Sequence, residues 1–385
     1  MNVAESDRHW MRRALTLAAA VMDLTTPNPR VGCVIVRDGH VLGEGATREA
    51  GGPHAEICAL RAAAANGVDT VGSTFYVTLE PCSHHGRTPP CVEAVLAARP
   101  ARVVVAMSDP NPRVNGSGLA RLRAAGIEVS TGVCLEEALA QNPGFVARMT
   151  RGTPWLWLKL AGSLDGRSAL HNGASQWITG AEARADGHAW RARSCVVLTG
   201  VGTVLADDPQ LTARHHTTPR QPQRAIVDSR LRTPPQARIL DDGNVWIFTA
   251  DGDHAARRPL LERGARIIDL PGADSRVDLP AMLRWLGQND VNEVHTEAGA
   301  VLNGALWQAG CVDEIIAYVA PMLLGDARPV VDLPALDSLP DREEFTFTEV
   351  ELMGVDVRLR ARRAANWAAL RAAVQAQPAQ RAQDG

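Results

Sequence analysis

Aromatic residues make up only 4% of this 385-residue chain, so alanine, valine and leucine must fill most of its core. Charge of one sign is lacking too, because 40 basic and 43 acidic residues leave a formal net charge of −3. Such a balanced chain has no general attraction to a polyphosphate backbone or an anionic membrane, so we expect no nucleic-acid partner. No apolar run reaches the roughly 20 residues that a membrane helix needs, and we expect no membrane association.

Cysteines are sparse, with seven spread thinly over the chain. An odd and scattered set does not resemble the disulfide framework of a small secreted domain, so metal binding or catalysis is the better reason for any special cysteine. The first residues include Glu5 and Asp7 rather than a basic segment that leads to a cleavage site. These features predict a cytoplasmic protein.

The length, at roughly 150 residues per domain, predicts two domains, or two and an appendage. Residues 1–150 interleave strands and helices, which is an α/β layer pattern. Strands are predicted at residues 75–79 and 102–107, helices at 54–65, 90–98 and 118–125, and a β-hairpin at 31–42 around Asp38-Gly39. The polar stretch that contains Asn142-Pro143-Gly144 places a boundary near residue 150.

Residues 151–362 again alternate between predicted strands and helices, and they form the second predicted domain. The expected strands cover residues 155–160, 195–198, 224–227, 245–249, 266–269, 293–296 and 315–319, followed by an antiparallel pair at 345–350 and 355–359. Residues 363–385 are rich in Ala, Arg and Gln. This composition predicts a helical or loose tail that the protein can do without.

The sharpest chemical signal is His54-Ala55-Glu56 at a helix start, followed by Pro81-Cys82 and then Cys91. One imidazole and two thiolates suit a tetrahedral zinc ion, and three protein ligands leave the fourth position for water. Zinc can lower the pKa of that water to about 7. Glu56 would then carry the proton to the ring nitrogen and the leaving amine, as in zinc nucleobase deaminases with an H-x-E and P-C-x-x-C signature.

The chain departs from that signature in the spacing of its cysteines. Eight residues, 83–90, separate Cys82 from Cys91, where the common form has two. A loop must therefore return Cys91 to the metal, at the start of the helix behind Pro90, where the helix dipole favours a thiolate. His84 and His85 lie in this loop and are alternative ligands. The alternative is a purely structural role, in which His54 caps a helix and the cysteines only fill the core.

At these residues the chain resembles the bifunctional pyrimidine deaminase/reductase family of riboflavin biosynthesis. The resemblance rests on residues 26–36 (TPNPRVGCVIV), 53–56 (PHAE) and 78–91 (TLEPCSHHGRTPPC), and the long loop between the cysteines is part of the family's pattern. It implies a cytidine-deaminase-like three-layer αβα domain at the N-terminus. It also implies that Asn28 and the 83–90 loop contact the substrate ring.

The second half has no G-x-G-x-x-G after its first strand, so a standard Rossmann site is not supported. It has instead several polar, glycine-bearing segments at strand ends, where open α/β sheets bind ligands. Residues 227–230 place Ser229 and an arginine after a strand, which suits a phosphate. Residues 296–304 form a strand, a small-residue turn and a helix start that could hold a pyrophosphate on backbone N–H groups. Each segment alone is also explained by a structural turn.

The order of these segments is similar to the reductase half of the same family, which implies a dihydrofolate-reductase-like α/β fold with NADPH as the hydride donor. The resemblance implies a substrate site at Ser175, Arg191, Leu211, Arg214 and Glu297. It implies a nucleotide site at Ala161, Trp177, Thr203, Asp207, Ser229, Gly299, Ala300, Val301, Leu302, Asn303, Gly304 and Ala305.

Four charged residues are of particular interest in this half. Arg191 and Arg214 suit a sugar phosphate, because a guanidinium grips phosphate oxygens through two parallel hydrogen bonds; solvated surface charges are the alternative. Lys159 could orient the ribose or assist proton transfer, or it could simply reach water from its strand end. Asp165 follows it in the same polar segment and is counted with the substrate site.

The sequence therefore predicts an α/β enzyme with two activities on a pyrimidine ribose phosphate. The first is zinc-dependent hydrolytic deamination, and the second is NADPH-dependent reduction of the ribosyl group to ribityl. The family suggests a homo-oligomer built through the reductase half. The alternatives are a deaminase of RNA or of a free nucleoside with an inactive second domain, and a nucleotide-sensing module with a structural zinc, against which Glu56 argues.

Overall fold

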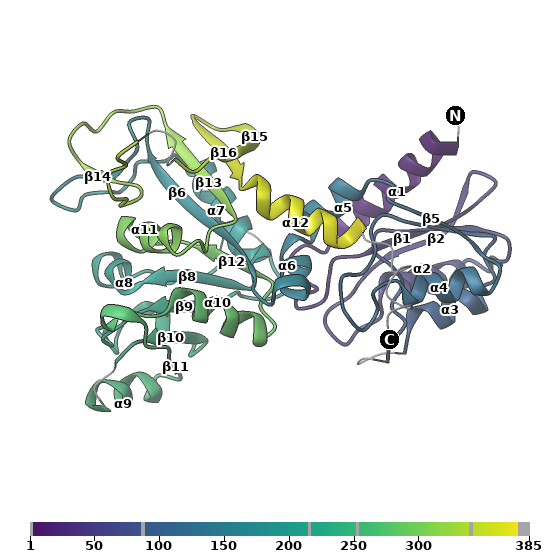
Figure 1. The fold of residues 1–385 in the computed structure, drawn as a ribbon, viewed down its shortest axis with the longest axis horizontal. Helices are drawn as coiled ribbons and strands as arrows, with labels where there is room; N and C mark the ends of the chain where they lie inside the picture. Colours follow the sequence, from purple (N-terminus) through teal and green to yellow (C-terminus); the bar gives the residue numbers. More distant parts are fainter. Residues whose placement is uncertain (1–2, 86–88, 215–216, 252–253, 339–341, 376–385) are drawn as a thin grey trace. The chain divides into compact units, whose positions relative to one another are not determined.

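The structure is a computed structural model that describes residues 3–85, 89–214, 217–251, 254–338 and 342–375 (Figure 1). The chain divides into two compact units. The first comprises Met1–Arg151 together with Ala368–Gly385, and the second comprises Gly152–Trp367. Among the described residues, no helix is both long and apolar enough to cross a membrane.

The first unit is built on a five-stranded sheet with the strand order β2-β1-β3-β4-β5. Strand β1 pairs antiparallel with β2 and β3, whereas β3, β4 and β5 are parallel. The strands are β1 (Gly32–Arg37), β2 (His40–Ala46), β3 (Thr74–Val77), β4 (Arg102–Val105) and β5 (Glu128–Thr131). The predicted hairpin at Asp38-Gly39 is confirmed, and both turn residues have positive φ.

In the described part of residues 3–151, the helices of this unit are α1 (Val3–Ala19), α2 (Ala55–Ala65), α3 (Cys91–Ala97), α4 (Ser117–Ala124), α5 (Leu135–Gln141) and α6 (Pro143–Arg151). Helix α2 lies against β2 because glycines leave room for it. A Cβ atom at Gly43 would lie 2.3 Å from the Ala59 carbonyl oxygen, and one at Gly45 would lie 2.4 Å from Cys58 Cβ. This close approach fixes the start of α2, where His54 and Glu56 are found.

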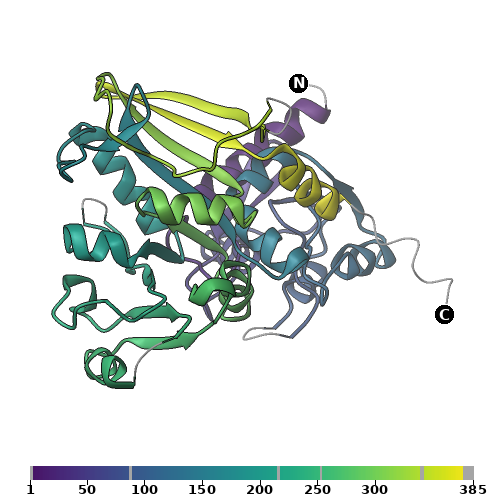
Figure 2. The same ribbon diagram turned by 60° about the vertical axis from the view of Figure 1, so that its left-hand side comes forward.

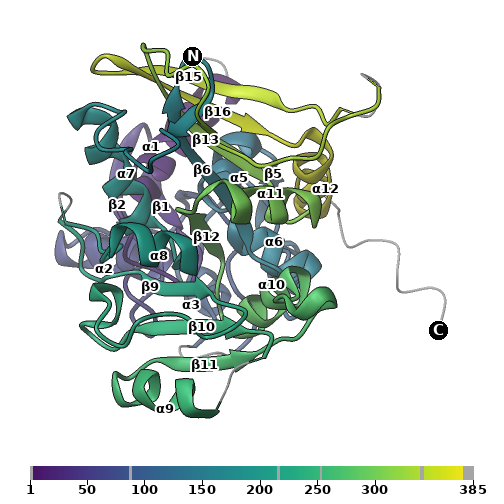
Figure 3. The same ribbon diagram turned by 90° about the vertical axis from the view of Figure 1, so that its left-hand side faces the viewer.

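The second unit is built on a nine-stranded sheet with the order β11-β10-β9-β8-β12-β6-β13-β16-β15. Its strands are β6 (Trp155–Ser163), β8 (Val196–Gly200), β9 (Gln223–Val227), β10 (Val245–Thr249), β11 (Arg266–Asp269), β12 (Glu293–Thr296), β13 (Glu314–Ala320), β15 (Thr346–Met353) and β16 (Asp356–Arg362). Figure 3 shows β9, β10 and β11 as consecutive neighbours, and Figure 2 shows β15 and β16 as a long hairpin. A separate pair joins β7 (Arg167–Ala169) to β14 (Arg328–Pro329).

Alternating side chains of these strands belong to two separate hydrophobic cores. Leu198 and Val294 face a core completed by α10 and α11, and Val197 and Ile226 face another completed by α8 and α9. The helices of this unit are α7 (Ala181–Arg193), α8 (Val201–Asp207), α9 (His254–Glu262), α10 (Leu279–Gln288) and α11 (Ala300–Gln308). Helices on two faces of a mostly parallel sheet are the expected α/β arrangement.

The tail continues as helix α12 (Ala364–Gln375), and from Ala368 onward it belongs to the first unit. Leu370 and Val374, four residues apart, are both buried. The backbone N–H of Ser108 donates to the Val374 carbonyl (3.3 Å), and Arg371 pairs with Glu136 (2.9 Å). Residues 364–375 are therefore helical, one of the two forms expected of the tail, and they pack through Leu370 and Val374. Residues 376–385 lie outside the described part.

Candidate active sites

Three side chains from separate elements converge at one end of the first unit. His54 precedes α2, Cys82 follows β3, and Cys91 is the first residue of α3, behind Pro90 as expected. His54 Nδ1 lies 3.6 Å from Cys82 Sγ and 3.2 Å from Cys91 Sγ. The three ligand atoms lie within 4.8 Å of one another, and they are the one such group among the described residues. One nitrogen and two sulfurs at these separations fit a zinc ion.

The two thiols influence each other strongly. Hydrogen bonds from Cys91 and His54 lower the pKa of Cys82 to about 4, and the backbone N–H of Cys91 donates to Cys82 Sγ at 3.2 Å. The hydrogen bond to Cys82 and burial raise the pKa of Cys91, because a second thiolate would lie beside the first. A divalent cation would relieve this conflict, since it stabilises both thiolates at once.

Glu56 lies on the first turn of α2, two residues after His54, and is only 3% exposed. Burial, followed by the charge of Cys82, raises the pKa of its carboxyl group to about 7. A bound cation would act in the opposite direction and favour the carboxylate. A carboxyl group held between these influences can both accept and return a proton near neutral pH, which is the task of a general acid/base.

Glu80 is a further residue of this site that the sequence reasoning missed. It precedes Pro81-Cys82 and is 2% exposed. Its carboxylate accepts four backbone N–H groups at 3.0–3.2 Å, from Asp109, Gly116, Gly118 and Leu119. Glu80 thereby connects the segment that carries Cys82 to the loop before α4 and to the first turn of that helix. An acidic residue directly before the Pro-Cys motif was the available signal.

The structure gives local contacts and burial for the remaining residues proposed for this site. Asn28 is part of a turn in which its backbone N–H donates to the Thr25 carbonyl (2.9 Å). His84 is half-buried and His85 exposed, and neither belongs to the group of ligand atoms, so the alternative ligands are not supported. Residues 86–88 of the proposed substrate loop lie outside the described residues.

A second cluster forms in the second unit, where β6 and β12 are parallel neighbours. Lys159 on β6 and Glu297 just after β12 lie one step beyond the aligned pair Thr296 and Leu158. Arg191 from α7 donates Nε and Nη2 to the two carboxylate oxygens of Glu297, with Nη2 at 2.9 Å. The structure thus brings together Lys159, Arg191 and Glu297, three of the predicted substrate residues.

Charge and burial set the protonation of this cluster. Burial opposes the Glu297 carboxylate, but Arg191 and Lys159 hold its pKa well below the usual range. Burial lowers the pKa of Lys159 against the attraction of Glu297. His295, which the sequence reasoning missed, is fully buried, and burial lowers its pKa to about 4, against the attraction of Glu297. The cluster is therefore a buried ion pair beside a neutral imidazole at neutral pH.

The proposed nucleotide residues gather on α8 and α11, which follow the adjacent strands β8 and β12. A Cβ atom at Gly299 would lie 3.9 Å from Thr203 Oγ1, and one at Gly200 would lie 3.2 Å from Leu302. The start of α11 lies at the carboxyl end of β12, beside the parallel strand β8. Backbone N–H groups in such a position can bind a dinucleotide phosphate.

Other members of that set have different surroundings. Ala161 is on β6, Asp207 is exposed at the end of α8, and Ser229 Oγ accepts the Val277 backbone N–H (3.3 Å). Trp177 is 68% exposed, with the Arg184 guanidinium 4.4 Å from its ring centroid.

Four predicted residues have structural contacts that the sequence did not reveal. The Leu211 side chain is 4% exposed and belongs to the core with Ile226, so only its backbone is free to meet a substrate. Asn303 is buried and donates to the Ala298 and Val330 carbonyls, and a Cβ atom at Gly304 would collide with Asp332. The Asp165 carboxylate accepts the backbone N–H groups of Leu324 and Gly325. Ser175, by contrast, is a half-buried loop residue before α7.

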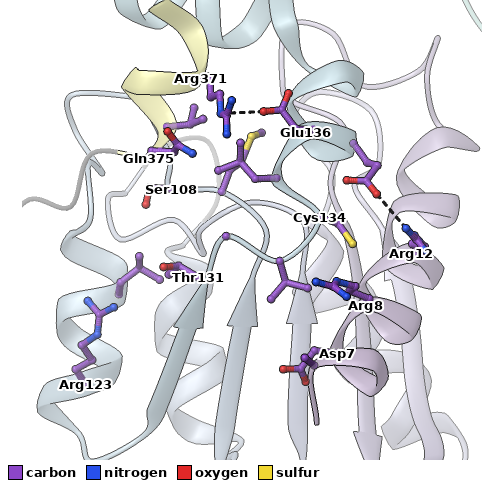
Figure 4. Close-up of a pocket in the computed structure, with 18 residues that line it drawn as sticks. Asp7, Arg8, Arg12, Ser108, Arg123, Thr131, Cys134, Glu136, Arg371 and Gln375 are labelled. Atoms are coloured by element: carbon purple, nitrogen blue, oxygen red, sulfur yellow. Dashed lines mark hydrogen bonds and ion pairs between the residues drawn. The ribbon is translucent and has the colours of Figure 1, made fainter. Parts of the chain in front are cut away.

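The first unit also contains a cavity of about 540 Å³ between α1, α5 and the end of α12 (Figure 4). Its three acidic residues are all paired: Asp7 with Arg102 (2.8 Å), Glu136 with Arg371 (2.9 Å) and Glu137 with Arg12 (3.5 Å). None of the three metal-ligand side chains lines this cavity. It is therefore separate from the metal site.

Fold and sites together define a two-enzyme chain, a zinc-dependent deaminase followed by a pyridine-nucleotide reductase. Residues 4–107 match the family model of the cytidine and deoxycytidylate deaminase zinc-binding region, and residues 154–359 match that of the RibD C-terminal domain. Riboflavin biosynthesis protein RibD of Escherichia coli (strain K12) is 47% identical over 367 residues, which cover 92% of this chain and 98% of the relative. The chain belongs to the RibD family of bifunctional riboflavin biosynthesis proteins.

Solved structures agree with this assignment. Acinetobacter baumannii RibD, form 1, has a TM-score of 0.85 at 42% identity and covers 93% of this chain and 99% of its own. The diaminohydroxyphosphoribosylaminopyrimidine deaminase/5-amino-6-(5-phosphoribosylamino)uracil reductase of Thermotoga maritima has a TM-score of 0.83 at 32% identity, with 94% and 99% covered. The expected fold class, with a deaminase-like first domain and a reductase second domain, is confirmed.

Proposed function

We propose that each unit carries one activity of the family. The first unit deaminates 2,5-diamino-6-(5-phosphoribosylamino)pyrimidin-4-one hydrolytically, with zinc held by His54, Cys82 and Cys91. The second unit reduces the ribosyl group of the product to ribityl with NADPH. The observation that carries the first assignment is His54 Nδ1 within 3.6 Å of both cysteine sulfurs, next to the buried Glu56.

In the deamination, Glu56 moves the proton. Zinc, when bound, supplies the positive charge that makes water acidic enough to attack at neutral pH. Glu56 takes one proton from the attacking water and delivers it to the ring nitrogen. It then carries the second proton, from the newly formed hydroxyl group on the ring carbon, to the amine, which leaves as ammonia while the carbonyl forms. Its burial keeps bulk water from competing for that proton. Asn28 is the proposed contact to the pyrimidine ring.

In the reduction, the buried cluster positions the sugar phosphate. NADPH, when bound, supplies the hydride. Lys159 and Glu297 would orient the opened ribose, and Ser175 would lie beside it. Arg214 is the proposed phosphate ligand, since it is an exposed residue. Partial burial of its guanidinium and the charges of Arg191 and Arg238 lower its pKa. A bound phosphate dianion would raise that pKa again.

The deaminase assignment is tested with Glu56→Gln. We expect ammonia release from the diaminopyrimidine substrate to fall by about 10²- to 10⁴-fold, while bound zinc and NADPH oxidation with the deaminated product stay at wild-type values. Glu49→Gln, at an exposed position of the same unit, is the matched control and should keep both activities. A Glu56→Gln variant that retains zinc and full ammonia release would contradict the proposed role.

A homo-oligomer through the second unit is part of the proposal. Strand β15 is an edge of the nine-stranded sheet, and Phe347, Val350 and Leu352 on it are 65–74% exposed. Exposed apolar side chains on an edge strand are typical of an interface. Light scattering of Leu352→Glu should show a shift toward monomer, and an unchanged mass would remove β15 from the interface.

The cytoplasm is the proposed location, supported by seven cysteines that form no disulfide in the described chain. The alternative of a nucleoside or RNA deaminase with an inactive second half is not favoured, because the family match extends over 154–359.

A further inference from the structure

The guanidinium of Arg191 donates its hydrogen bonds to groups of the protein. Nε and Nη2 donate to Glu297, and Nη1 donates to the Thr212 carbonyl at 3.0 Å. Both partners of the ion pair are only 14% exposed. Each of the three nitrogens therefore donates to a protein acceptor, so Arg191 orients the Glu297 carboxylate and the backbone of Thr212.

His188 lies one helical turn before Arg191 on α7 and is 7% exposed. Its Nδ1 accepts the backbone N–H of Arg214 at 3.2 Å and faces Arg191 Nη1 at 3.5 Å. A ring nitrogen that accepts an N–H bond carries no proton, so the proton of the neutral ring is on Nε2. His188 and Arg191 thus hold the segment of Thr212 to Arg214 at two points, one carbonyl and one N–H.

The side chain of Arg214, unlike that of Arg191, forms no ion pair within the part of the chain that the structure describes. It is exposed, and Nη1 donates to Thr212 Oγ1 (3.1 Å) and more weakly to Gln210 Oε1 (3.4 Å). These neutral contacts orient the guanidinium without neutralising it. Arg214 is therefore presented to solvent from a backbone that α7 holds in place.

We propose that His188 is a positioning residue of the reductase site: its Nδ1 fixes the backbone of Arg214, so that Arg214 presents its guanidinium to the phosphate of the substrate. This inference rests on the proposed function, which places Arg214 at the substrate. Because the bond acts on a binding residue away from the hydride acceptor, its loss affects substrate affinity and leaves the chemical step largely intact.

Two variants of His188 separate the hydrogen bond from ring packing. His188→Phe keeps a ring but has no acceptor, whereas His188→Gln has an acceptor oxygen but no ring. We expect His188→Phe to raise the KM for the phosphorylated reductase substrate about tenfold with kcat within about twofold, the size of one lost hydrogen bond. His188→Gln should restore KM to within about threefold of wild type. Ammonia release should be unchanged in both.

The phosphate is tested directly with the phosphatase-treated substrate. His188→Phe and the wild type should then have equal kcat/KM, because the guanidinium no longer has its partner. If His188→Phe matches the wild type on the phosphorylated substrate while His188→Gln is impaired, packing rather than the hydrogen bond matters and the proposal is overturned.

Arg214→Ala distinguishes this failure from a failure of the proposed substrate site. A raised KM in Arg214→Ala, combined with a normal KM in His188→Phe, overturns only the role of His188. An unchanged KM in Arg214→Ala removes Arg214 from the substrate site and overturns both.

Discussion

His295 should make the stability of the second unit depend on pH. The side chain is fully buried on β12 and stacked on Trp190, with ring centroids 6.4 Å apart and planes at 13°. Burial, with the charges of Lys159 and Arg191, lowers its pKa from 6.5 to about 4, against the attraction of Glu297. The unfolded chain therefore binds a proton at this residue below pH 6.5, whereas the folded chain does so only near pH 4.

The sign and size of the effect follow from linkage. Because the folded pKa is depressed, stability is fully present above pH 6.5 and is lost as the pH falls toward 4. The full shift corresponds to about 3 kcal/mol, of which about 2 kcal/mol falls between pH 7.5 and 5. Stopping at pH 5 keeps Glu297 out of the measurement, since an ordinary glutamate gains its proton near pH 4.3 or below.

Urea unfolding followed by tryptophan fluorescence at pH 7.5 and 5 measures this loss. The signal reports the second unit, because eight of the nine tryptophans lie between Gly152 and Trp367. His295→Phe keeps a ring against Trp190 but cannot titrate, so its loss of unfolding free energy should be smaller than that of the wild type by about 2 kcal/mol. His171→Phe, at a position 66% exposed, should behave like the wild type. Equal losses in His295→Phe and the wild type would refute the reasoning.

Three further outcomes are expected. Cys91→Ser should lose bound zinc and ammonia release but keep NADPH oxidation with the deaminated substrate; full zinc by mass spectrometry would contradict the ligand set. Glu80→Gln, which leaves backbone N–H groups near Cys82 without a carboxylate, should destabilise the first unit by about 2 to 3 kcal/mol in calorimetry, and an unchanged transition would show that the four bonds contribute nothing. Leu370→Ala should lower the unfolding free energy of the same unit by about 2 to 3 kcal/mol in calorimetry, and an unchanged transition would show that α12 is not packed there.

Much of the deaminase site was accessible from the sequence because each ligand carries a local signal. His54 and Glu56 lie at the start of a helix, and Cys91 begins a helix behind a proline, as predicted. Cys82 was expected at a strand end but lies five residues beyond β3, which ends at Val77. Their convergence needed only the α/β layering that the pattern already indicated. Glu80 escaped notice because its four partners lie 29–39 residues further along the chain, which no local pattern reveals.

The reductase cluster was less accessible for the same reason. The sequence singled out Arg191, but its bonds to Glu297 and Thr212 depend on how α7 lies against β12. His188 had one available signal, its place one turn before Arg191. Leu211 was predicted as a substrate contact, yet its side chain fills the core, since composition does not tell which side of a loop faces inward. The tail was judged by its composition, although the spacing of Leu370 and Val374 already indicated one apolar helix face.

The return of α12 to the first unit affects the order in which the protein can be completed during synthesis. Residues 368–375 leave the ribosome after the whole reductase unit. The deaminase unit therefore receives its last helical segment only when the reductase unit is already folding. Cutting the gene between the two enzymes would therefore yield a deaminase half that lacks the partners of Ser108 and Glu136 on α12, together with the part of the cavity lining that Arg371, Val374 and Gln375 supply. Separate expression of that half should need residues 368–375 supplied as a peptide or fused by a linker.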